Sequence, residues 1–299
     1  MANEQEQIFM GIRDASFKTL LTGILERGKL KPKYIDVLTS DENMRKYDQA
    51  FTAASANEHC NYEIFEQLGD LSANKFIVWY AYKRFPQLRC PLGVKVVARL
   101  RINYGARKSF AKIADDLGFW MYISASEEER SRRKKDLLED CLESFIGCTE
   151  QILDEAFRPG VGYGIVYDIL ANIFDAIRMS LQYKDLYDSK TRLKELFDAH
   201  KDLGSWVYID SRNDMIAESV LYRVPAACAC KHASKRRTGP GARDYVLTPH
   251  RDWARIGKGT AAKKSDAQQY AAEDGLRTLR RSGWEKPVPA EYERFSQHS

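Results

Sequence analysis

The sequence predicts an α+β protein, with an all-helical N-terminal domain at residues 8–186 and an α-β-β-β-α domain at residues 188–282. Two observations predict this division. Through the first part, apolar residues recur every three or four positions, which is the spacing of helices that bury one face. After residue 188, short segments rich in β-branched and aromatic residues lie between two helical patterns, as expected for strands.

The N-terminal domain is expected to begin with a helix whose apolar stripe is Phe17, Leu20, Leu21, Ile24 and Leu25. Asp41 and Glu42 are a favourable start for another helix. A long helix is expected over residues 61–83, ending before Pro86, because the residue before a proline avoids helical geometry. The later segments are predicted as a solvated helix start or loop at 126–135, a loop at 159–164 and a helix at 165–182.

The C-terminal domain is expected to follow the order helix, strand, strand, insertion, strand, helix. A helix is expected at 191–200 and strands at 205–209 and 217–224. They are followed by a basic glycine-rich insertion at about 225–242, strand material at 244–247 and 253–257, and a closing helix at 262–281. Residues 283–299 contain two prolines and few apolar residues, so a flexible tail is predicted there.

Two groups of acidic side chains lie at helical spacing among apolar residues. Glu63, Glu66 and Asp70 share one helical face, because residues three or four apart are neighbours on a helix. Asp140 and Glu143 share a face in the same way. Burying such carboxylates is costly unless a positive charge compensates, and Mg²⁺ prefers oxygen ligands. A magnesium site is therefore one interpretation, and ordinary surface charge is the alternative.

Two glycines favour a packed site over surface charge. Gly69 lies inside the first helical pattern, where glycine costs about 1 kcal/mol relative to alanine. Gly147 follows the second acidic group after an apolar run. A glycine inside a helix often marks the close approach of another chain segment. The sequence therefore predicts that the acids lie where two segments meet.

The same segments resemble a known family. Residues 61–70 read NYEIFEQLGD and resemble the signature helix of the ribonuclease III family, and residues 140–147 read DCLESFIG and resemble its second acidic motif. Further segments resemble the stretches between these motifs and the two ends of the family's double-stranded RNA-binding domain. These segments are 84–86, 109–114, 117–118, 188–195, 257–259, 263–264 and 271–272. The resemblance covers roughly residues 10 to 282, in the order of the family.

The resemblance implies that Glu66, Asp70, Asp140 and Glu143 bind catalytic Mg²⁺, with Mn²⁺ as a substitute, and that Glu63 orients these ligands. It implies a hydrolase, an endonuclease that cuts both strands of double-stranded RNA with two metal ions about 3.5–4 Å apart. Glu143 is the candidate for the carboxylate nearest the reactive water. Family members without activity lose some of these acids. The intact set therefore favours an enzyme over a catalytically silent protein that sequesters double-stranded RNA.

The resemblance also implies contacts to RNA and to a second subunit. Thr191 and Lys194 match positions that meet the minor groove, which proteins read by its shape. Lys263 and Lys264 start the closing helix, where a helix N-terminus favours phosphate, and solvated surface is the alternative for this pair. Each acidic motif occurs once, so cutting two strands implies a symmetric homodimer. Gln67 replaces a hydrophobic residue that packs at the family's dimer contact.

The distribution of charge fits a C-terminal module that binds a polyanion. Residues 201–299 contain 18 Lys and Arg against 12 Asp and Glu, a net charge of +6, which leaves −1 for the other 200 residues. The N-terminus does not resemble a signal peptide, and no stretch is long and apolar enough to span a bilayer. The sequence therefore predicts an intracellular, cytoplasmic protein with no membrane partner.

The six cysteines show no spacing typical of a disulfide framework. Cys141 and Cys148 lie in an apolar run and are expected to be buried thiols. Cys228 and Cys230 with His232 are a weak indication of zinc, since no second pair of cysteines lies nearby.

The arrangement of one nuclease domain and one RNA-binding domain resembles bacterial and viral members of the family more than the multidomain Dicer type. The basic insertion and the divergence from the bacterial pattern favour a large DNA virus or an unusual eukaryotic lineage as the source. Ribosomal precursor processing, messenger turnover and destruction of silencing RNA all use this chemistry, and the sequence leaves these three roles open.

Overall fold

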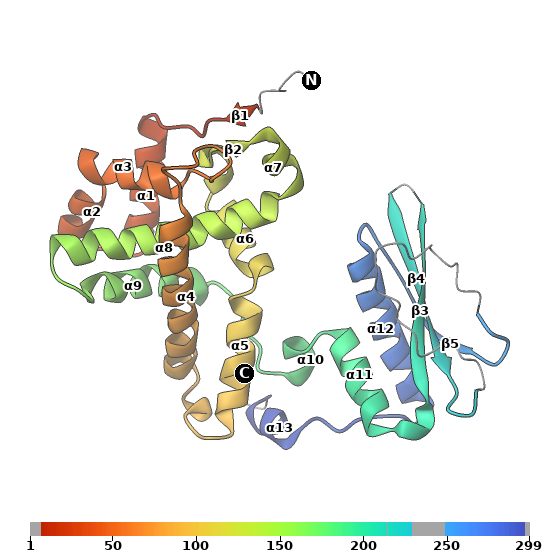
Figure 1. The fold of residues 1–299 in the computed structure, drawn as a ribbon. Coiled ribbons are helices and arrows are strands. Elements are labelled where there is room, and N and C mark those ends of the chain that lie inside the picture. The colour runs from red at the N-terminus through yellow and green to blue at the C-terminus, as the bar shows by residue number, and fades with distance from the viewer. Residues whose placement is uncertain (1–6, 214, 229–248, 297–299) are drawn as a thin grey trace. The chain divides into compact units, whose positions relative to one another are not determined.

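The computed structural model describes residues 7–213, 215–228 and 249–296 of the 299-residue chain. Its contacts divide the chain into two units, Met1–Met179 and Ser180–Ser299. Figure 1 shows mainly helices in the first unit and a three-stranded sheet with helices in the second. The predicted α+β fold class is confirmed. The domain limits 8–186 and 188–282 stay a prediction.

The first unit is built mainly from helices in the part of the chain that the structure describes. The helices are α1 (Ala15–Arg27), α2 (Pro32–Leu38), α3 (Asp41–Ala50), α4 (Glu63–Arg84), α5 (Gly93–Tyr104), α6 (Arg107–Asp116), α7 (Glu127–Arg132), α8 (Lys134–Ala156) and α9 (Val161–Asp175). Two short strands, β1 (Ile8–Phe9) and β2 (Ala125–Ser126), pair antiparallel. Single 3-10 turns lie at Pro86–Leu88 and Phe119–Tyr122.

Helix α8 lies in the core of the first unit. Every residue from 141 to 149 is buried, including one acid, and a helix covered on most of its circumference is expected at the centre of a bundle. Helices α3, α4, α6 and α9 pack against α8, and Figure 1 shows α4 crossing it. The rings of Phe17, Phe51, Phe119 and Phe145 form a chain of edge-to-face contacts with centroids 4.9–5.6 Å apart. This packing holds the acid-bearing helices in fixed positions.

In its described residues, the second unit has a sheet of three antiparallel strands in the order β3-β4-β5, with helices α11 and α12 on one face (Figure 1). The elements are α10 (Tyr183–Leu186), α11 (Ser189–Ala199), a 3-10 turn (Lys201–Leu203), β3 (Ser205–Asn213), β4 (Ile216–Val224), β5 (Ala254–Ala261), α12 (Lys264–Arg281) and α13 (Ala290–Ser296). A Cβ on Gly257 or Gly259 would lie 2.2 or 2.1 Å from a carbonyl oxygen of α12, so β5 and α12 are closely packed. The predicted order helix, strand, strand, strand, helix is observed.

The structure differs from the prediction for the helix expected at 165–182. Helix α9 begins at Val161 and ends at Asp175, so two glycines of the predicted loop belong to the helix. Gly162 fits there because a Cβ would lie 2.2 Å from the carbonyl oxygen of Glu150 on α8. The backbone N–H groups of Gly160 and Gly162 donate to the Asp154 carboxylate. Glycine at this position therefore serves close helix packing rather than a loop.

Residues predicted as a flexible tail are packed against the second unit. The Lys286 ammonium lies 2.6 Å from the Glu195 carboxylate of α11. Tyr292 of α13 is 2% exposed, and its hydroxyl lies 2.6 Å from the hydroxyl of Tyr187. The aromatic residue of α13 gives this segment an apolar face that its composition conceals.

Part of the predicted C-terminal domain lies outside the described residues. Residues 229–248 contain most of the basic insertion and the candidate strand at 244–247. The strand predicted at 253–257 is observed as β5, which continues to Ala261.

Candidate active site

The two acidic groups lie on helices α4 and α8, whose backbones approach so closely that no side chain fits at the contact. A Cβ on Gly69 of α4 would lie 1.7 Å from the carbonyl oxygen of Glu143 on α8. A Cβ on Gly147 of α8 would lie 2.1 Å from the carbonyl oxygen of Phe65 on α4. Glycine is therefore required at both positions, and the prediction that Gly69 marks a close approach is confirmed. The contact brings the acids of α4 beside the acids of α8.

Three of the predicted acids form one cluster. Glu66, Asp140 and Glu143 each offer a carboxylate oxygen, and these oxygens lie within 4.8 Å of one another. Glu143 is buried, whereas Glu66 and Asp140 are half-buried and keep access to solvent. The cluster therefore has one buried carboxylate and two that solvent can reach, so a ligand from solution has access to it.

The cluster is electrostatically unfavourable without a cation. Burial raises the pKa of Glu143 to about 8, and the neighbouring carboxylate of Asp70 adds to this rise. Burial likewise raises the pKa of Glu66 to about 7, with the Asp140 carboxylate as the next cause. The pKa of Asp140 is raised by burial too. Raised pKa values at several converging acids are typical of functional sites.

The other two predicted acids lie at the edge of the cluster. Asp70 is outside the group of oxygens within 4.8 Å, and its Oδ1 accepts a hydrogen bond of 2.6 Å from the side-chain amide of Asn74. Its charge nevertheless raises the pKa of both Glu143 and Glu66. Glu63 is exposed in the first turn of α4 and contributes to the raised pKa of Glu66.

Sequence reasoning missed the residues that support the cluster. The buried Tyr62 hydroxyl donates to Oδ2 of Asp140 at 3.0 Å, and this bond fixes the direction of that carboxylate. Arg107 of α6 donates to Glu139 at 2.5 Å and to Asp136 at 2.7 Å. Tyr62 lies inside the signature segment, but nothing in the sequence indicates that its hydroxyl bonds Asp140. Arg107 gives no local signal, because only the packing of α6 on α8 brings it close.

The donor set fits a hard divalent cation. The donors that the described residues bring to the cluster are carboxylate oxygens, which Mg²⁺ and Mn²⁺ prefer. The nearby guanidinium of Arg107 bonds Glu139 and Asp136, so it does not take the place of a metal at the cluster. Glu66, Asp140 and Glu143 are the residues suited to hold the ion directly.

The four residues predicted to contact RNA lie in the second unit. Lys194 is exposed on α11, and Thr191 in the first turn of that helix donates to Asp188 at 2.7 Å. Lys263 precedes α12 and Lys264 begins it, and both are exposed. The Lys264 ammonium lies 2.9 Å from the carboxylate of Asp210 on β3. Helix α11 begins two residues before the predicted start at 191, and α12 begins two residues after the predicted start at 262.

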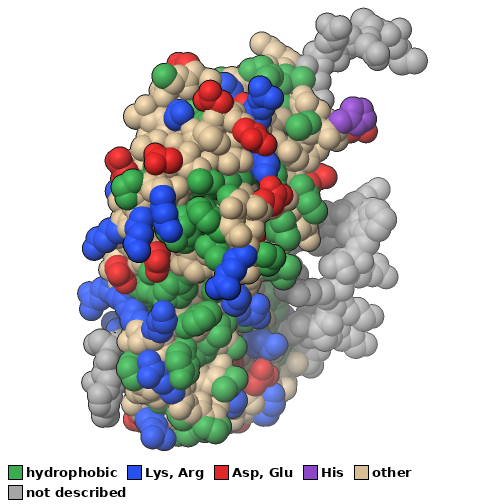
Figure 2. Space-filling model, turned by 90° about the vertical axis from the view of Figure 1, so that its left-hand side faces the viewer, with side chains coloured by type: hydrophobic (Ala, Val, Ile, Leu, Met, Phe, Trp, Pro, Cys, Tyr) green, Lys and Arg blue, Asp and Glu red, His purple; other side chains and the backbone are tan. Residues whose placement is uncertain are grey.

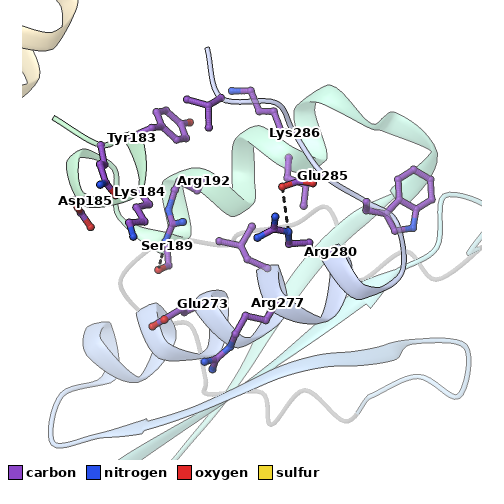
Figure 3. Close-up of a pocket in the computed structure, with 15 residues that line it drawn as sticks. Tyr183, Lys184, Asp185, Ser189, Arg192, Glu273, Arg277, Arg280, Glu285 and Lys286 are labelled. Atoms are coloured by element: carbon purple, nitrogen blue, oxygen red, sulfur yellow. Dashed lines mark hydrogen bonds and ion pairs between the residues drawn. The ribbon is translucent and has the colours of Figure 1, made fainter. Parts of the chain in front are cut away.

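The second unit also contains a pocket of about 750 Å³ between α10, α11, α12 and the segment that follows α12 (Figure 3). Its lining includes several charged side chains that are paired with each other or with neighbours. Arg280 lies 3.3 Å from Glu285, and Arg192 donates to Ser189. None of the four predicted RNA-contacting residues lines this pocket.

No helix among the described residues is both long enough and apolar enough to cross a membrane.

Comparisons with known proteins agree with the acidic motifs. A family model described as the Ribonuclease III domain matches residues 63–150, which contain all of the predicted acids. A protein of Invertebrate iridescent virus 6, provisionally named ribonuclease 3, is 38% identical over 285 residues, covering 91% of this chain and 90% of its own length.

One further relative and one solved structure are similar to parts of this chain. A protein of Frog virus 3 (isolate Goorha), also provisionally named ribonuclease 3, is 38% identical over 264 residues, covering 87% of this chain and 62% of its own length. The solved nuclease domain of ribonuclease III from Campylobacter jejuni is 25% identical, with a TM-score of 0.40 and coverage of 50% of this chain and 99% of that domain.

Proposed function

The chain belongs to the ribonuclease III family, and from this premise we propose that it is a Mg²⁺-dependent endonuclease that hydrolyses double-stranded RNA on both strands. One observation carries the proposal. Carboxylate oxygens of Glu66, Asp140 and Glu143 lie within 4.8 Å of one another at the crossing of α4 and α8. Keeping three acids together costs stability, and a bound cation is the natural reason for the arrangement.

The residues of the cluster have distinct proposed roles. Glu66, Asp140 and Glu143 would hold metal directly, and Asp70 would hold it directly or through water. Mg²⁺ bound by these residues would supply a water of lowered pKa and would stabilise the leaving oxygen of the phosphodiester. Glu143, the most buried acid of the cluster, is our candidate for the carboxylate nearest that water.

Residues around these ligands would keep them in position. The Tyr62 hydroxyl would orient Asp140 through its hydrogen bond, and exposed Glu63 would orient water around Glu66. There is no side-chain nucleophile in this scheme.

We assign RNA binding to the second unit. Thr191 and Lys194 on α11 would meet the minor groove, whose shape and 2′-hydroxyls proteins recognise. Lys263 and Lys264 at the start of α12 would contact phosphate together with the free N–H groups of that helix. Lys264 would exchange its ion pair with Asp210 for a phosphate. Residues 188–282 would then act as a double-stranded RNA-binding domain, and residues 8–186 as the nuclease domain.

A homodimer would supply the second cutting centre. Ile64, Leu68, Leu71, Val78 and Trp79 of α4 are 40–69% exposed and follow helical spacing. Figure 2 shows hydrophobic side chains at the surface beside Lys and Arg. Exposed apolar stripes of this kind mark protein interfaces. Two copies related by a two-fold axis would place one acidic cluster on each strand of a duplex.

Cleavage of long duplex RNA tests the proposal. We expect short products with Mg²⁺ or Mn²⁺ and none with chelator. Glu143→Gln should lower the rate by roughly 10³-fold or more, because a metal ligand is lost. Glu63→Gln should lower it by only about 10–100-fold, as expected for a residue that acts through the ligands.

The binding of duplex RNA by the same variants serves as the control. Glu143→Gln should bind with unchanged affinity in chelator, since the RNA contacts lie elsewhere. If wild-type protein binds duplex RNA without cutting it under every metal condition, the chain is a sequestering protein and the proposal is wrong.

A further inference from the structure

A second group of potential metal ligands lies in the C-terminal unit, with a different chemistry. The thiol sulfur of Cys228, a ring nitrogen of His250 and a carboxylate oxygen of Asp252 lie within 4.8 Å of one another. Cys228 follows the end of β4, and the other two precede the start of β5. The two ends of the long β4–β5 connection therefore meet at this group.

Each end of the connection is held by the strands. The backbone N–H of Cys228 donates to the carbonyl of Pro225 at 2.9 Å, in a turn directly after β4. On the other side, the backbone N–H of Trp253 donates to the carbonyl of His250 at 2.9 Å. Trp253 is 8% exposed, and its ring contacts Tyr222 of β4. The donors are thus presented by anchored backbone.

The three kinds of donor atom in this group, sulfur, nitrogen and oxygen, indicate which metal ion it would bind. A thiolate, an imidazole and a carboxylate together are the ligands of Zn²⁺, whereas Mg²⁺ takes oxygen ligands only. Ligands around tetrahedral zinc lie about 3.3–3.8 Å apart, given bonds of about 2.0–2.3 Å. Shifts of about an ångström would therefore bring the three donors to bonding positions. Nδ1 of His250 lies 3.3 Å from the Asp252 carboxylate and accepts a hydrogen bond of 3.3 Å from the backbone N–H of Asp252.

We propose that Cys228, His250 and Asp252 bind one Zn²⁺ ion that ties the two ends of the β4–β5 connection together. The Cys228 thiol releases its proton to water as the sulfur–zinc bond forms, and one coordination position stays open for water or a further ligand. Cys230 and His232 lie outside the described residues and take no part in this assignment. The site is separate from the carboxylate cluster in ligand type.

Cobalt substitution in the full chain tests the site. Metal-stripped protein in excess Mg²⁺ is titrated with Co²⁺, and absorption from thiolate-to-cobalt charge transfer is followed before Zn²⁺ is added. We expect one equivalent of Co²⁺ per chain to give this band and one equivalent of Zn²⁺ to abolish it. Zn²⁺ should also raise the unfolding temperature by about 5 °C, since a ligand that binds only the folded state stabilises it.

Matched variants assign the signal to these residues. Cys228→Ser should lose the charge-transfer band, while Cys60→Ser, which changes an exposed cysteine of the first unit, should keep it. Asp252→Asn should keep the band but weaken Zn²⁺ binding at least 10-fold. This variant tests the site if Cys228→Ser fails to fold. Glu143→Gln should bind Zn²⁺ as the wild type does. An unchanged band in Cys228→Ser, unchanged affinity in Asp252→Asn, or no Zn²⁺ binding by the wild type would overturn the proposal.

Discussion

At the scale of single residues, the carboxylates of the cluster oppose folding when no metal is bound. The pKa of Glu143 rises from its ordinary value of 4.5 to about 8 in the folded chain, mainly through burial. Its proton is therefore held in the folded state at pH values where the unfolded chain has released it. The contribution of Glu143 to the free energy of unfolding then falls as pH increases from about 5 to about 8, because the folded state holds more protons at this group.

The fall in stability with increasing pH predicts how Glu143→Gln behaves in chelator. Near pH 4.5 the variant and the wild type should be about equally stable, whereas at pH 8 the variant should be more stable by a few kcal/mol, at about 1.4 kcal/mol per pKa unit. Saturating Mg²⁺ should reverse the order at pH 8, since only the wild type retains the full ligand set. Urea unfolding of both proteins at the two pH values, with and without Mg²⁺, measures these stabilities. A wild type that gains stability between pH 5 and 8 in chelator would contradict it.

The residues that bear charge in this site were predictable, but their supporting contacts were not. Glu66, Asp140 and Glu143 stand in motifs that can be read along one helix at a time. The hydrogen bond from Tyr62 to Asp140 joins residues 78 positions apart and depends on how α4 and α8 cross. The convergence of Cys228 with His250 likewise depends on the strands that hold the two ends of the connection.

At the scale of elements, the crossing of α4 and α8 depends on two glycines. Gly69→Ala would place a Cβ 1.7 Å from the backbone oxygen of Glu143, and a backbone atom has little freedom to move away. We therefore expect Gly69→Ala to lower the free energy of unfolding by about 3 kcal/mol or more and to reduce cleavage with it.

Gly23→Ala on α1 is the matched control, because a Cβ there meets no atom within 4 Å. It should leave the chain as stable or up to about 1 kcal/mol more stable, through the better helix propensity of alanine. Thermal unfolding followed by circular dichroism compares the two. Equal unfolding temperatures for both variants would show that the helices are not in close contact.

Most elements could be predicted from periodicity and turn residues, and the differences have identifiable causes. The long helix expected at 61–83 is observed as α4, and the closing helix at 262–281 as α12. Helix α9 begins earlier than predicted, because Gly162, which indicates a loop locally, allows the close approach of α8. The segment after residue 283 packs through Tyr292, which a composition dominated by proline and polar residues does not reveal.

At the scale of the whole molecule, the exposed stripe on α4 predicts the assembly state. Leu71 is 69% exposed, although leucine gains free energy from burial. Leu71→Lys should therefore give a monomer in light scattering where the wild type is a dimer, and paired cuts on the two strands should be lost. Met121→Lys changes another exposed apolar residue of the first unit, away from α4, and should stay dimeric. A Leu71→Lys monomer that still cuts both strands together would contradict the dimer.

The central claim is that acids from two crossing helices hold the catalytic metal, and diffraction from crystals grown with Mn²⁺ tests it most directly. We predict an anomalous peak for Mn²⁺ bounded by the carboxylates of Glu66, Asp140 and Glu143, and its loss in Glu143→Gln. Mn²⁺ bound only at other positions, with these three carboxylates turned away from one another, would contradict the claim.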